Sequence, residues 1–307
     1  MALISVIVPM FNAADTLAET IESIRAQTWT RWEAILVDGG SDDGTFAIAA
    51  KLAAEEPRIR LARSPRPGPS AARNHGAMDL ARGDLLAFCD ADDLWQPNKL
   101  GDAADAVLGG LADAAFGRVG VFHDVPEDIL HWSNVAPGLT TVPVLLTDNP
   151  VGPLSNLSVS RAVFAELGGL REDMVQGAEL EFMIRLAGEG FCLRGLDADH
   201  LRYRLRPNGL SADTDAVRKG RLMALRTALR MHCVPTASGE ALSLREMAHR
   251  ALASELPARD VRRLVSEGCS MDARAFLLPA RRGVFLALTA WMLPALPRWL
   301  KRSMMPW

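Results

Sequence analysis

Three short apolar runs in the first part of the chain are each followed within a few positions by polar residues. The runs are Leu3–Pro9, Ala34–Val37 and Leu85–Cys89. Their length and composition are typical of strands buried on both faces. A shorter run and three segments with helical spacing of apolar residues alternate with them: Arg58–Ala62, and residues 14–27, 45–54 and 70–82. This alternation predicts an α/β fold with a mainly parallel sheet and helices on both faces.

The polar residues that follow these runs are expected to meet at one edge of the sheet. Ligands of parallel sheets bind at the carboxyl ends of the strands. Pro9–Asn12, Asp38 and Asp90–Asp93 all fall at predicted carboxyl ends. The sequence therefore predicts one crevice that is lined by these three segments.

The run Leu85–Cys89 leads directly into three carboxylates within four positions. Because residues two apart point the same way in an extended chain, Asp90 and Asp92 are expected to aim at one point. Two convergent carboxylates form a hard-oxygen site for Mg²⁺ or Mn²⁺, and these cations also take phosphate oxygens of a substrate. The simpler alternative is a solvated acidic turn after a buried strand.

Four motifs follow one another in this part of the chain: Ser5–Asn12, Glu33–Thr45, Ala72–Gly76 and Phe88–Asp93. In order and spacing they resemble the motifs of the family 2 glycosyltransferases, which have the GT-A nucleotide-sugar fold. The resemblance covers roughly residues 3–211 and fades after that. It implies an inverting, hexosyl-type transfer from a nucleoside diphosphate sugar, a UDP-sugar above others, with Mn²⁺ or Mg²⁺ as cofactor.

The resemblance also implies which residues contact the nucleotide. Pro9, Phe11 and Asn12 match the turn that lies against it, and Asp38 matches an aspartate that accepts a hydrogen bond from the base. The family usually has a second aspartate after this one, where this chain has Gly39. That departure leaves the identity of the base open.

The diphosphate end of the donor is matched by acidic and basic residues together. Asp90 corresponds to an aspartate near the ribose or the metal, and Asp92 to the metal ligand that bridges to the diphosphate. Arg73 corresponds to an arginine near the nucleotide. The alternative for Arg73 is a residue on a helix face that pairs with Asp38 or Asp42.

A catalytic base is expected in the stretch Gly177–Leu186, which resembles the family's Glu-Asp-x-Asp/Glu pattern. Alignment on Arg185 places Glu179 on the aspartate that serves as base and Ala178 on the preceding glutamate. Inversion in one step needs a base opposite the leaving group to take the proton of the acceptor hydroxyl. Glu181 and Asp173 are the reserve candidates. The alternative is that these acids only favour the start of a helix.

A last motif, Tyr203–Ser211, resembles a loop of the family in which a histidine often faces the diphosphate or the metal. Arg206 stands at that position. It can hold a diphosphate with its guanidinium but cannot be a metal ligand. The alternative is an arginine of a surface loop.

Charge divides the chain unevenly, although the overall net charge is only −3. Residues 217–307 hold sixteen Lys and Arg against six Asp and Glu, a net charge of +10, and residues 1–216 carry −13. We therefore expect a GT-A domain at 1–216, with a nucleotide-binding half 1–110 and an acceptor half 111–216, and a basic helical region at 217–307. Helices are predicted at 217–232 and 240–266.

Such a basic tail indicates an anionic partner. No nucleic-acid-reading motif is present in the tail, so nucleic acid is not the expected partner. The uncharged stretch 283–297 is shorter than the about 20 residues that a membrane span needs. Arg and Trp residues flank it. These features favour a segment 275–302 that lies on an anionic membrane surface. The alternative is a terminal helix docked on protein.

Four cysteines without paired spacing fit a reducing compartment, and the start of the chain lacks the pattern of a signal peptide. The sequence thus predicts a cytoplasmic, peripheral membrane enzyme that acts on a glycan or lipid-linked acceptor in cell-surface glycan or glycolipid synthesis. A non-catalytic protein that binds a nucleotide sugar is the alternative. A dinucleotide-dependent dehydrogenase is excluded, since no Gly-x-Gly-x-x-Gly follows Val8.

Overall fold

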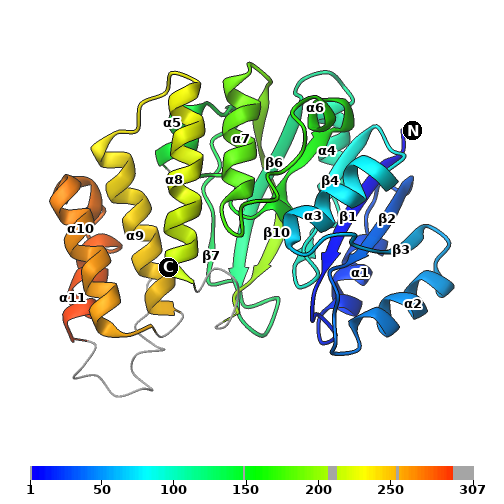
Figure 1. The fold of residues 1–307 in the computed structure, drawn as a ribbon, viewed down its shortest axis with the longest axis horizontal. Coiled ribbons are helices and arrows are strands. Elements are labelled where there is room, and N and C mark those ends of the chain that lie inside the picture. The colour runs from blue at the N-terminus through cyan, green and yellow to red at the C-terminus, as the bar shows by residue number, and fades with distance from the viewer. Residues whose placement is uncertain (1, 148, 207–212, 254–255, 293–307) are drawn as a thin grey trace.

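The computed structural model describes all residues except 1, 148, 207–212, 254–255 and 293–307. Its centre is one mixed sheet with the strand order β3-β2-β1-β4-β9-β6-β10-β5, and β7 and β8 pair at its side (Figure 1). The strands are β1 Ile4–Met10, β2 Trp32–Asp38, β3 Ile59–Arg63, β4 Leu85–Phe88, β5 Leu94–Trp95, β6 Ala114–Phe122, β7 His131–Trp132, β8 Gly138–Leu139, β9 Ser158–Ser160 and β10 Leu193–Arg204.

Parallel pairing of the first four strands confirms the predicted α/β sheet. Strand β1 lies between β2 and β4, and its last residue, Met10, pairs with Asp38 at the end of β2. Strands β6 and β10 are also parallel to each other, whereas β9 is antiparallel to its neighbours β4 and β6. The carboxyl ends of β1, β2, β4, β6 and β10 therefore lie at the same edge, the lower one in Figure 1.

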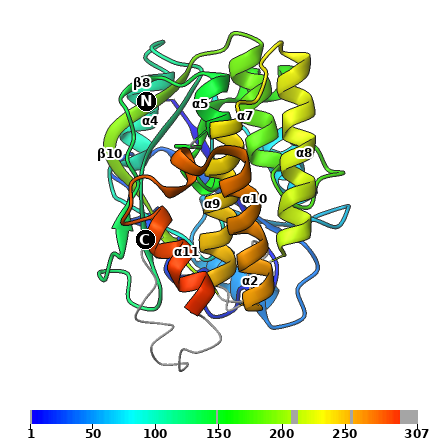
Figure 2. The same cartoon turned by 90° about the vertical axis from the view of Figure 1, so that its left-hand side faces the viewer.

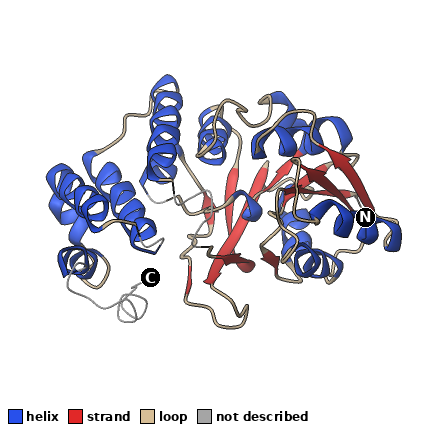
Figure 3. Ribbon diagram, turned by 60° about the horizontal axis from the view of Figure 1, so that its bottom comes forward, coloured by secondary structure: helices blue, strands red, loops and turns tan. Residues whose placement is uncertain are grey.

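Helices cover both faces of the sheet, and more helices gather beyond β10 (Figure 3). The helices are α1 Leu17–Arg25, α2 Thr45–Glu55, α3 Pro69–Asn74, α4 Lys99–Val107, α5 Val142–Thr147, α6 Arg161–Glu166, α7 Ala178–Gly188, α8 Thr214–Arg230, α9 Ala237–Ala253, α10 Ala258–Leu277 and α11 Gly283–Met292. A π-helical turn, His75–Leu80, and a 3₁₀ turn, Leu154–Asn156, complete the described elements. One apolar cluster fills each side of the sheet.

The C-terminal helices form a separate apolar cluster made by α9, α10 and α11 (Figure 2). The single helix predicted over 240–266 is wrong, because α9 ends at Ala253 and α10 begins at Ala258 after the N-cap Pro257. Proline is tolerated at a helix start but not inside one. Helix α8 instead buries Ala224 and Ala228 in the cluster between α7 and the sheet. The domain boundary at 216 stays a prediction.

The described residues contain no helix that is both long and apolar enough to cross a membrane. Helix α11 covers part of the predicted membrane-surface segment, and residues 293–302 of that segment lie outside the described residues.

A buried lysine joins the start of α4 to the 3₁₀ turn that precedes β9. The Nζ of Lys99, fully buried, donates a hydrogen bond of 2.9 Å to the carbonyl oxygen of Asn156. The Asn156 amide in turn donates to the carbonyl oxygens of Gly117 and Val151, so it ties β6 to the loop before β9. Burial lowers the pKa of Lys99 to about 7. The fold thus buries an amine that is charged in the unfolded chain at neutral pH.

Replacing Lys99 with Met should change how stability depends on pH. Between the folded-state pKa of about 7 and the unfolded-state value of 10.5, the unfolded chain holds a proton that the folded chain lacks. Wild-type stability should therefore rise relative to Lys99→Met as pH increases from 7 to 10, by up to about 1.4 kcal/mol per pH unit. Urea unfolding at several pH values measures this. The exposed Lys51→Met is the control, and parallel curves for Lys99→Met and wild type would contradict the assignment.

Candidate active site

The turns after β1 and β2 are joined by backbone and side-chain hydrogen bonds. Asp38 is buried, and its carboxylate accepts hydrogen bonds of 3.2 Å from the backbone N–H groups of Gly40 and Ser41. The N–H of Gly39 donates to the carbonyl oxygen of Met10 at 2.8 Å. The Asp38 carboxylate is thus fixed at the carboxyl end of β2, with two of its acceptor positions already used.

Asn12 connects the same two turns from the side of β1. It has a left-handed φ of 49°, its N–H donates to Ser41 Oγ at 3.0 Å, and its Oδ1 accepts from the N–H of Asp42 at 3.0 Å. The neighbouring Phe11 ring is 67% exposed, whereas Pro9 is half-buried in β1. An exposed aromatic ring beside a rigid turn provides a surface on which a planar base can stack.

The acidic residues after β4 form a turn rather than an extended strand. Strand β4 ends at Phe88, and the N–H of Asp93 donates to the carbonyl oxygen of Asp90 at 3.1 Å. The prediction that Asp90 and Asp92 converge through extended backbone is therefore wrong in its geometry. The N–H of Asp90 donates to Ser155 Oγ at 2.9 Å, which fixes the start of the turn.

Each of the two candidate metal ligands has an arginine partner from a distant element. Arg73 of α3 contacts Asp90 Oδ1 at 2.5 Å, so it pairs with neither Asp38 nor Asp42. Arg206 Nε lies 3.1 Å from Asp92 Oδ2, and Arg206 Nη2 donates to Thr16 Oγ1 at 3.0 Å. Two guanidinium groups thus partly balance the charge of the acidic turn.

Two residues for which the sequence predicted no role, Asp93 and Arg204, support this turn. Asp93 is fully buried and accepts a hydrogen bond of 3.1 Å from the N–H of Arg204. The Arg204 side chain donates to the carbonyl oxygen of Asp92 and contacts Glu19 at 2.5 Å. Burial and the charges of Asp92 and Asp90 raise the pKa of Asp93 well above its usual value. In the sequence, the pair Tyr203-Arg204 close to Arg206 is the feature that could have indicated this role.

The acidic turn offers two carboxylates, those of Asp90 and Asp92, to a divalent cation. Burial, followed by the charge of Asp90, raises the pKa of Asp92, while Arg206 lowers it. The two carboxylates therefore still repel each other, and a cation between them would remove that repulsion. Within the described part of the chain, no group of three or more His, Cys, Asp or Glu side chains could hold a metal ion. Asp90 and Asp92 are the candidate ligands, together with oxygen atoms from a substrate.

Glu179 and Glu181 differ sharply, although both lie in the first turn of α7. Glu181 is 2% exposed, pairs with Arg185 at 2.9 Å and accepts from Thr227 Oγ1 at 3.0 Å. Arg185 also donates to the carbonyl oxygens of Leu167 and Gly169. Glu181 therefore holds α7, α8 and the turn after α6 together.

Glu179 is half-buried and forms no hydrogen bond or ion pair with any described residue. Burial lowers the pKa of Arg73, but the charges of Asp90 and Glu179 raise it above its usual value overall. The charges of Glu179 and of Asp90 in the acidic turn thus both act on the guanidinium of Arg73. The reserve candidate Asp173 is paired with Arg171 at 2.6 Å on an exposed loop.

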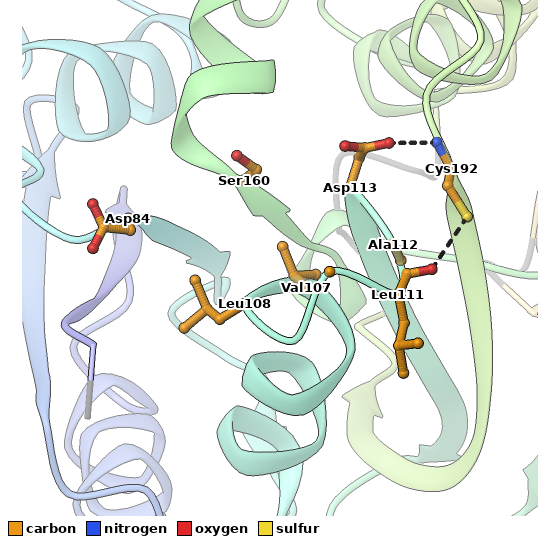
Figure 4. A pocket seen from close by; sticks show the side chains of 9 residues that line it. Asp84, Val107, Leu108, Leu111, Ala112, Asp113, Ser160 and Cys192 are labelled. Carbon is orange, nitrogen blue, oxygen red and sulfur yellow. Dashed lines mark hydrogen bonds between the residues drawn. The ribbon is translucent and has the colours of Figure 1, made fainter.

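A separate pocket of about 300 Å³ lies at the opposite edge of the sheet (Figure 4). Its lining includes Asp84, Asp113 and Cys192, which directly precede β4, β6 and β10. An Asp113 carboxylate oxygen accepts a hydrogen bond of 2.7 Å from the N–H of Cys192. This pocket is at the amino ends of the parallel strands and contains none of the candidate site residues.

The sheet order, the buried α/β core and the polar turns at the strand ends define the GT-A class of fold. Residues 5–168 match the family described as Glycosyl transferase family 2. The chain belongs to this family.

Curated relatives match part of the chain. It is 36% identical over 144 residues to the uncharacterized glycosyltransferase YibD of Escherichia coli, which covers 44% of this chain and 41% of that protein. It is 29% identical over 154 residues to the Escherichia coli UDP-Glc:alpha-D-GlcNAc-diphosphoundecaprenol beta-1,3-glucosyltransferase WfgD, covering 50% of this chain and 58% of WfgD. A putative teichuronic acid biosynthesis glycosyltransferase, TuaG of Bacillus subtilis, is 36% identical to this chain. The match covers 32% of this chain and 39% of TuaG. Each match thus spans less than two thirds of the relative's length.

Solved structures extend the similarity to the whole chain at the level of the fold. TarS of S. aureus in complex with UDP-GlcNAc has a TM-score of 0.56 at 17% identity, covering 99% of this chain and 84% of that one. The mannosyltransferase PcManGT from Pyrobaculum calidifontis, in complex with GDP-Man and Mn²⁺, has a TM-score of 0.59 at 19% identity. This match covers 99% of the present chain and 83% of the PcManGT chain. The predicted GT-A fold is confirmed.

Two conservative substitutions on α7 should separate chemistry from stability. Glu179→Gln should lower the rate of donor turnover by at least about a hundredfold, because Gln cannot accept a proton, and should leave the melting temperature unchanged. Glu181→Gln should lower the melting temperature by several degrees, because it removes the charge that compensates the half-buried Arg185. Thermal unfolding and release of nucleoside diphosphate measure the two effects. An inactive Glu181→Gln that melts like wild type, beside an active Glu179→Gln, would reverse the assignment.

Proposed function

We propose that this protein transfers a hexosyl group, with inversion, from a nucleoside diphosphate sugar to an acceptor hydroxyl. The observation that carries the proposal is the acidic turn Asp90–Asp93, which pairs with two arginines and lies at the same edge of the sheet as Asp38, with the end of β1 between them. A uridine nucleotide is the first candidate, since the TarS structure contains UDP-GlcNAc and the name of WfgD contains UDP-Glc. The PcManGT structure contains GDP-Man, so guanosine is tested beside it.

The donor would lie across the carboxyl ends of β1, β2 and β4. Phe11 and the fixed Asp38 turn would contact the base, with Pro9 and Asn12 shaping the wall against it. Arg73 and Arg206 would exchange their carboxylate partners, in part, for diphosphate oxygens, since a planar guanidinium can bind both. Mn²⁺ or Mg²⁺ held by Asp90 and Asp92 would supply further positive charge to the departing diphosphate.

The acceptor would approach from the side of α7. Glu179 would take the proton of the acceptor hydroxyl while its oxygen forms a bond to the anomeric carbon. The bond from that carbon to the diphosphate breaks, and the nucleoside diphosphate leaves toward Arg73 and Arg206. Because base and leaving group are on opposite faces of the sugar, the configuration inverts. The charges of Asp90 and Glu179 both act on Arg73, which would therefore help to orient both the base and the leaving diphosphate.

A non-catalytic role in binding nucleotide sugars is favoured by one observation, the ion pair between Arg206 and Asp92. That pair occupies the carboxylate that a metal would need. Turnover separates the two functions, since only an enzyme consumes donor in a manner that depends on Asp92.

Calorimetric titration with UDP, GDP and dTDP, with and without Mn²⁺, tests the donor site. Wild type should bind one of these nucleotides at least tenfold more tightly when Mn²⁺ is present, because the cation joins two carboxylates to a diphosphate. Asp92→Ala should lose this gain. Asp105→Ala, which changes an exposed carboxylate of α4, should behave like wild type. Binding of none of the three nucleotides by the folded protein would overturn the proposal.

A peripheral place on the cytoplasmic face of the cell membrane would bring the site to a glycan or lipid-linked acceptor. Helix α11 has an exposed apolar stripe at helical spacing, with Val284 36%, Leu288 58% and Trp291 65% exposed. The exposed Arg281 precedes it. Apolar residues and Trp on one face, with Arg beside them, are typical of helices that lie in an anionic membrane interface.

Leu288→Asp should weaken binding to vesicles that contain phosphatidylglycerol, because it places a charge in the apolar stripe. Leu222→Asp is the matched control, since Leu222 is 59% exposed and Leu288 is 58% exposed, but Leu222 lies on α8. Co-sedimentation with vesicles measures both. Equal loss in the two variants, or no vesicle binding by wild type, would contradict a membrane-facing α11.

A further inference from the structure

Helix α7, which carries the candidate base, meets α8 through two glycines. Gly177 is the N-cap of α7, lies two positions before Glu179 and has a left-handed φ of 76°. Gly220 of α8 is buried against it, and the two helices lie side by side in Figures 1 and 2. A Cβ atom at Gly177 would lie 3.2 Å from the carbonyl carbon of Gly220. The two backbones thus approach each other with no side chain between them.

A side chain at position 220 has no room. A Cβ atom there would lie 2.7 Å from the carbonyl carbon of Gln176 and would overlap its oxygen, whereas real Cβ atoms practically never come within 3.0 Å of another heavy atom. Because carbon atoms in ordinary contact are about 3.5 Å apart, a methyl group would push the two segments apart by about 1 Å. Alanine is the stronger helix former. Helix propensity therefore does not explain a glycine in the second turn of α8.

The position of this contact determines where α7 begins. The carbonyl oxygen of Gly177 accepts a hydrogen bond of 3.0 Å from the N–H of Glu181, which closes the first helical turn around Glu179. A shift of Gly177 would therefore move the Glu179 carboxylate with it. The segment before the helix is more open to solvent, since Val175 is 65% exposed. The contact with α8 thus bears directly on the position of the candidate base.

Helix α8 is in turn fixed by other helices, two of which follow it in the chain. The Arg221 side chain, one position after the glycine, donates to Glu240 of α9 and to the carbonyl oxygen of Leu146 of α5, each at 2.6 Å. Arg218 pairs with Glu267 of α10. Both arginines flank the glycine within two positions. The C-terminal helices therefore restrain α8 at the point where it meets α7.

We propose that Gly220 is a positioning residue for Glu179. This inference rests on the proposed transferase function, with Glu179 as its base. The absence of a side chain at 220 lets the α8 backbone contact the residues before α7, which keeps the base at the place that proton transfer requires. A misplacement of about 1 Å can cost about a hundredfold in rate. The C-terminal helices are thereby assigned to deprotonation of the acceptor, whereas the donor site, on the turns after β1, β2 and β4, is expected not to depend on them.

Gly220→Ala tests the proposal in the full chain. It should lower kcat for release of nucleoside diphosphate at least about tenfold and leave the KM of the donor unchanged, because the base moves and the donor site does not. Calorimetric binding of the nucleotide with Mn²⁺ should also stay like wild type. Gly188→Ala is the matched control. It strains the same pair of helices at the other end of α7, where its Cβ would meet the side chain of Met231, and it should keep the wild-type kcat.

Thermal unfolding of the same samples separates positioning from stability. A purely structural role predicts that kcat follows the melting temperature in both variants. An equal loss of kcat in Gly188→Ala, an unchanged kcat in Gly220→Ala, or a loss of nucleotide affinity in Gly220→Ala would overturn the proposal. Wild type that turns over no donor would instead reject the proposed function.

A second variant, Gly177→Asn, covers the case in which Gly220→Ala does not fold. Asparagine tolerates a left-handed backbone, and its Cβ would strain the same contact more mildly, from the side of α7. The value of kcat should fall about threefold or more at an unchanged donor KM. A folded Gly177→Asn with the wild-type kcat would overturn the proposal.

Discussion

Charge compensation at the acidic turn is the interaction on which the site depends. Asp90, Asp92 and Asp93 lie within four positions at the end of a buried strand, so their repulsion would destabilise the turn if it were not balanced. Arg73 and Arg206 each pair with one of these carboxylates, and the backbone N–H of Arg204 holds the buried Asp93. Residues from α3 and from the end of β10 thereby meet at β4. The turn thus joins segments that are far apart in the sequence.

The same compensation gives the site a way to respond to its substrate. A guanidinium bound to a carboxylate can rearrange to bind a diphosphate with little loss, provided that a cation takes its place at the carboxylate. Donor and cation would then each favour the binding of the other. The diphosphate of the donor takes the guanidinium away from the carboxylate, and the cation takes the place of the guanidinium at that carboxylate. Arg73 extends the coupling, because Glu179 and Asp90 both act on its charge. The proposed base and the proposed leaving-group site are thus linked by one side chain.

Local patterns allowed the strands and their polar ends to be predicted, because buried parallel strands are continuous apolar runs and their carboxyl ends coincide in space. The conformation of Asp90–Asp93 was not predictable in this way, since a hydrogen bond from the N–H of Asp93 to the carbonyl oxygen of Asp90 replaces the extended chain. Nor does sequence distinguish Glu179 from Glu181, because the difference arises from Arg185 and Thr227.

The proposed reaction of this site is the transfer of a glycosyl group with inversion, with Glu179 as base. Water can replace the acceptor, so ¹H NMR of slow donor hydrolysis tests the claim without a known acceptor. With an α-linked UDP-glucose, UDP-GlcNAc or GDP-mannose and Mn²⁺, the account predicts that the β anomer of the free sugar appears first, ahead of mutarotation, and that Glu179→Gln abolishes it. Initial release of the α anomer, or hydrolysis that Glu179→Gln leaves unchanged, would contradict the account.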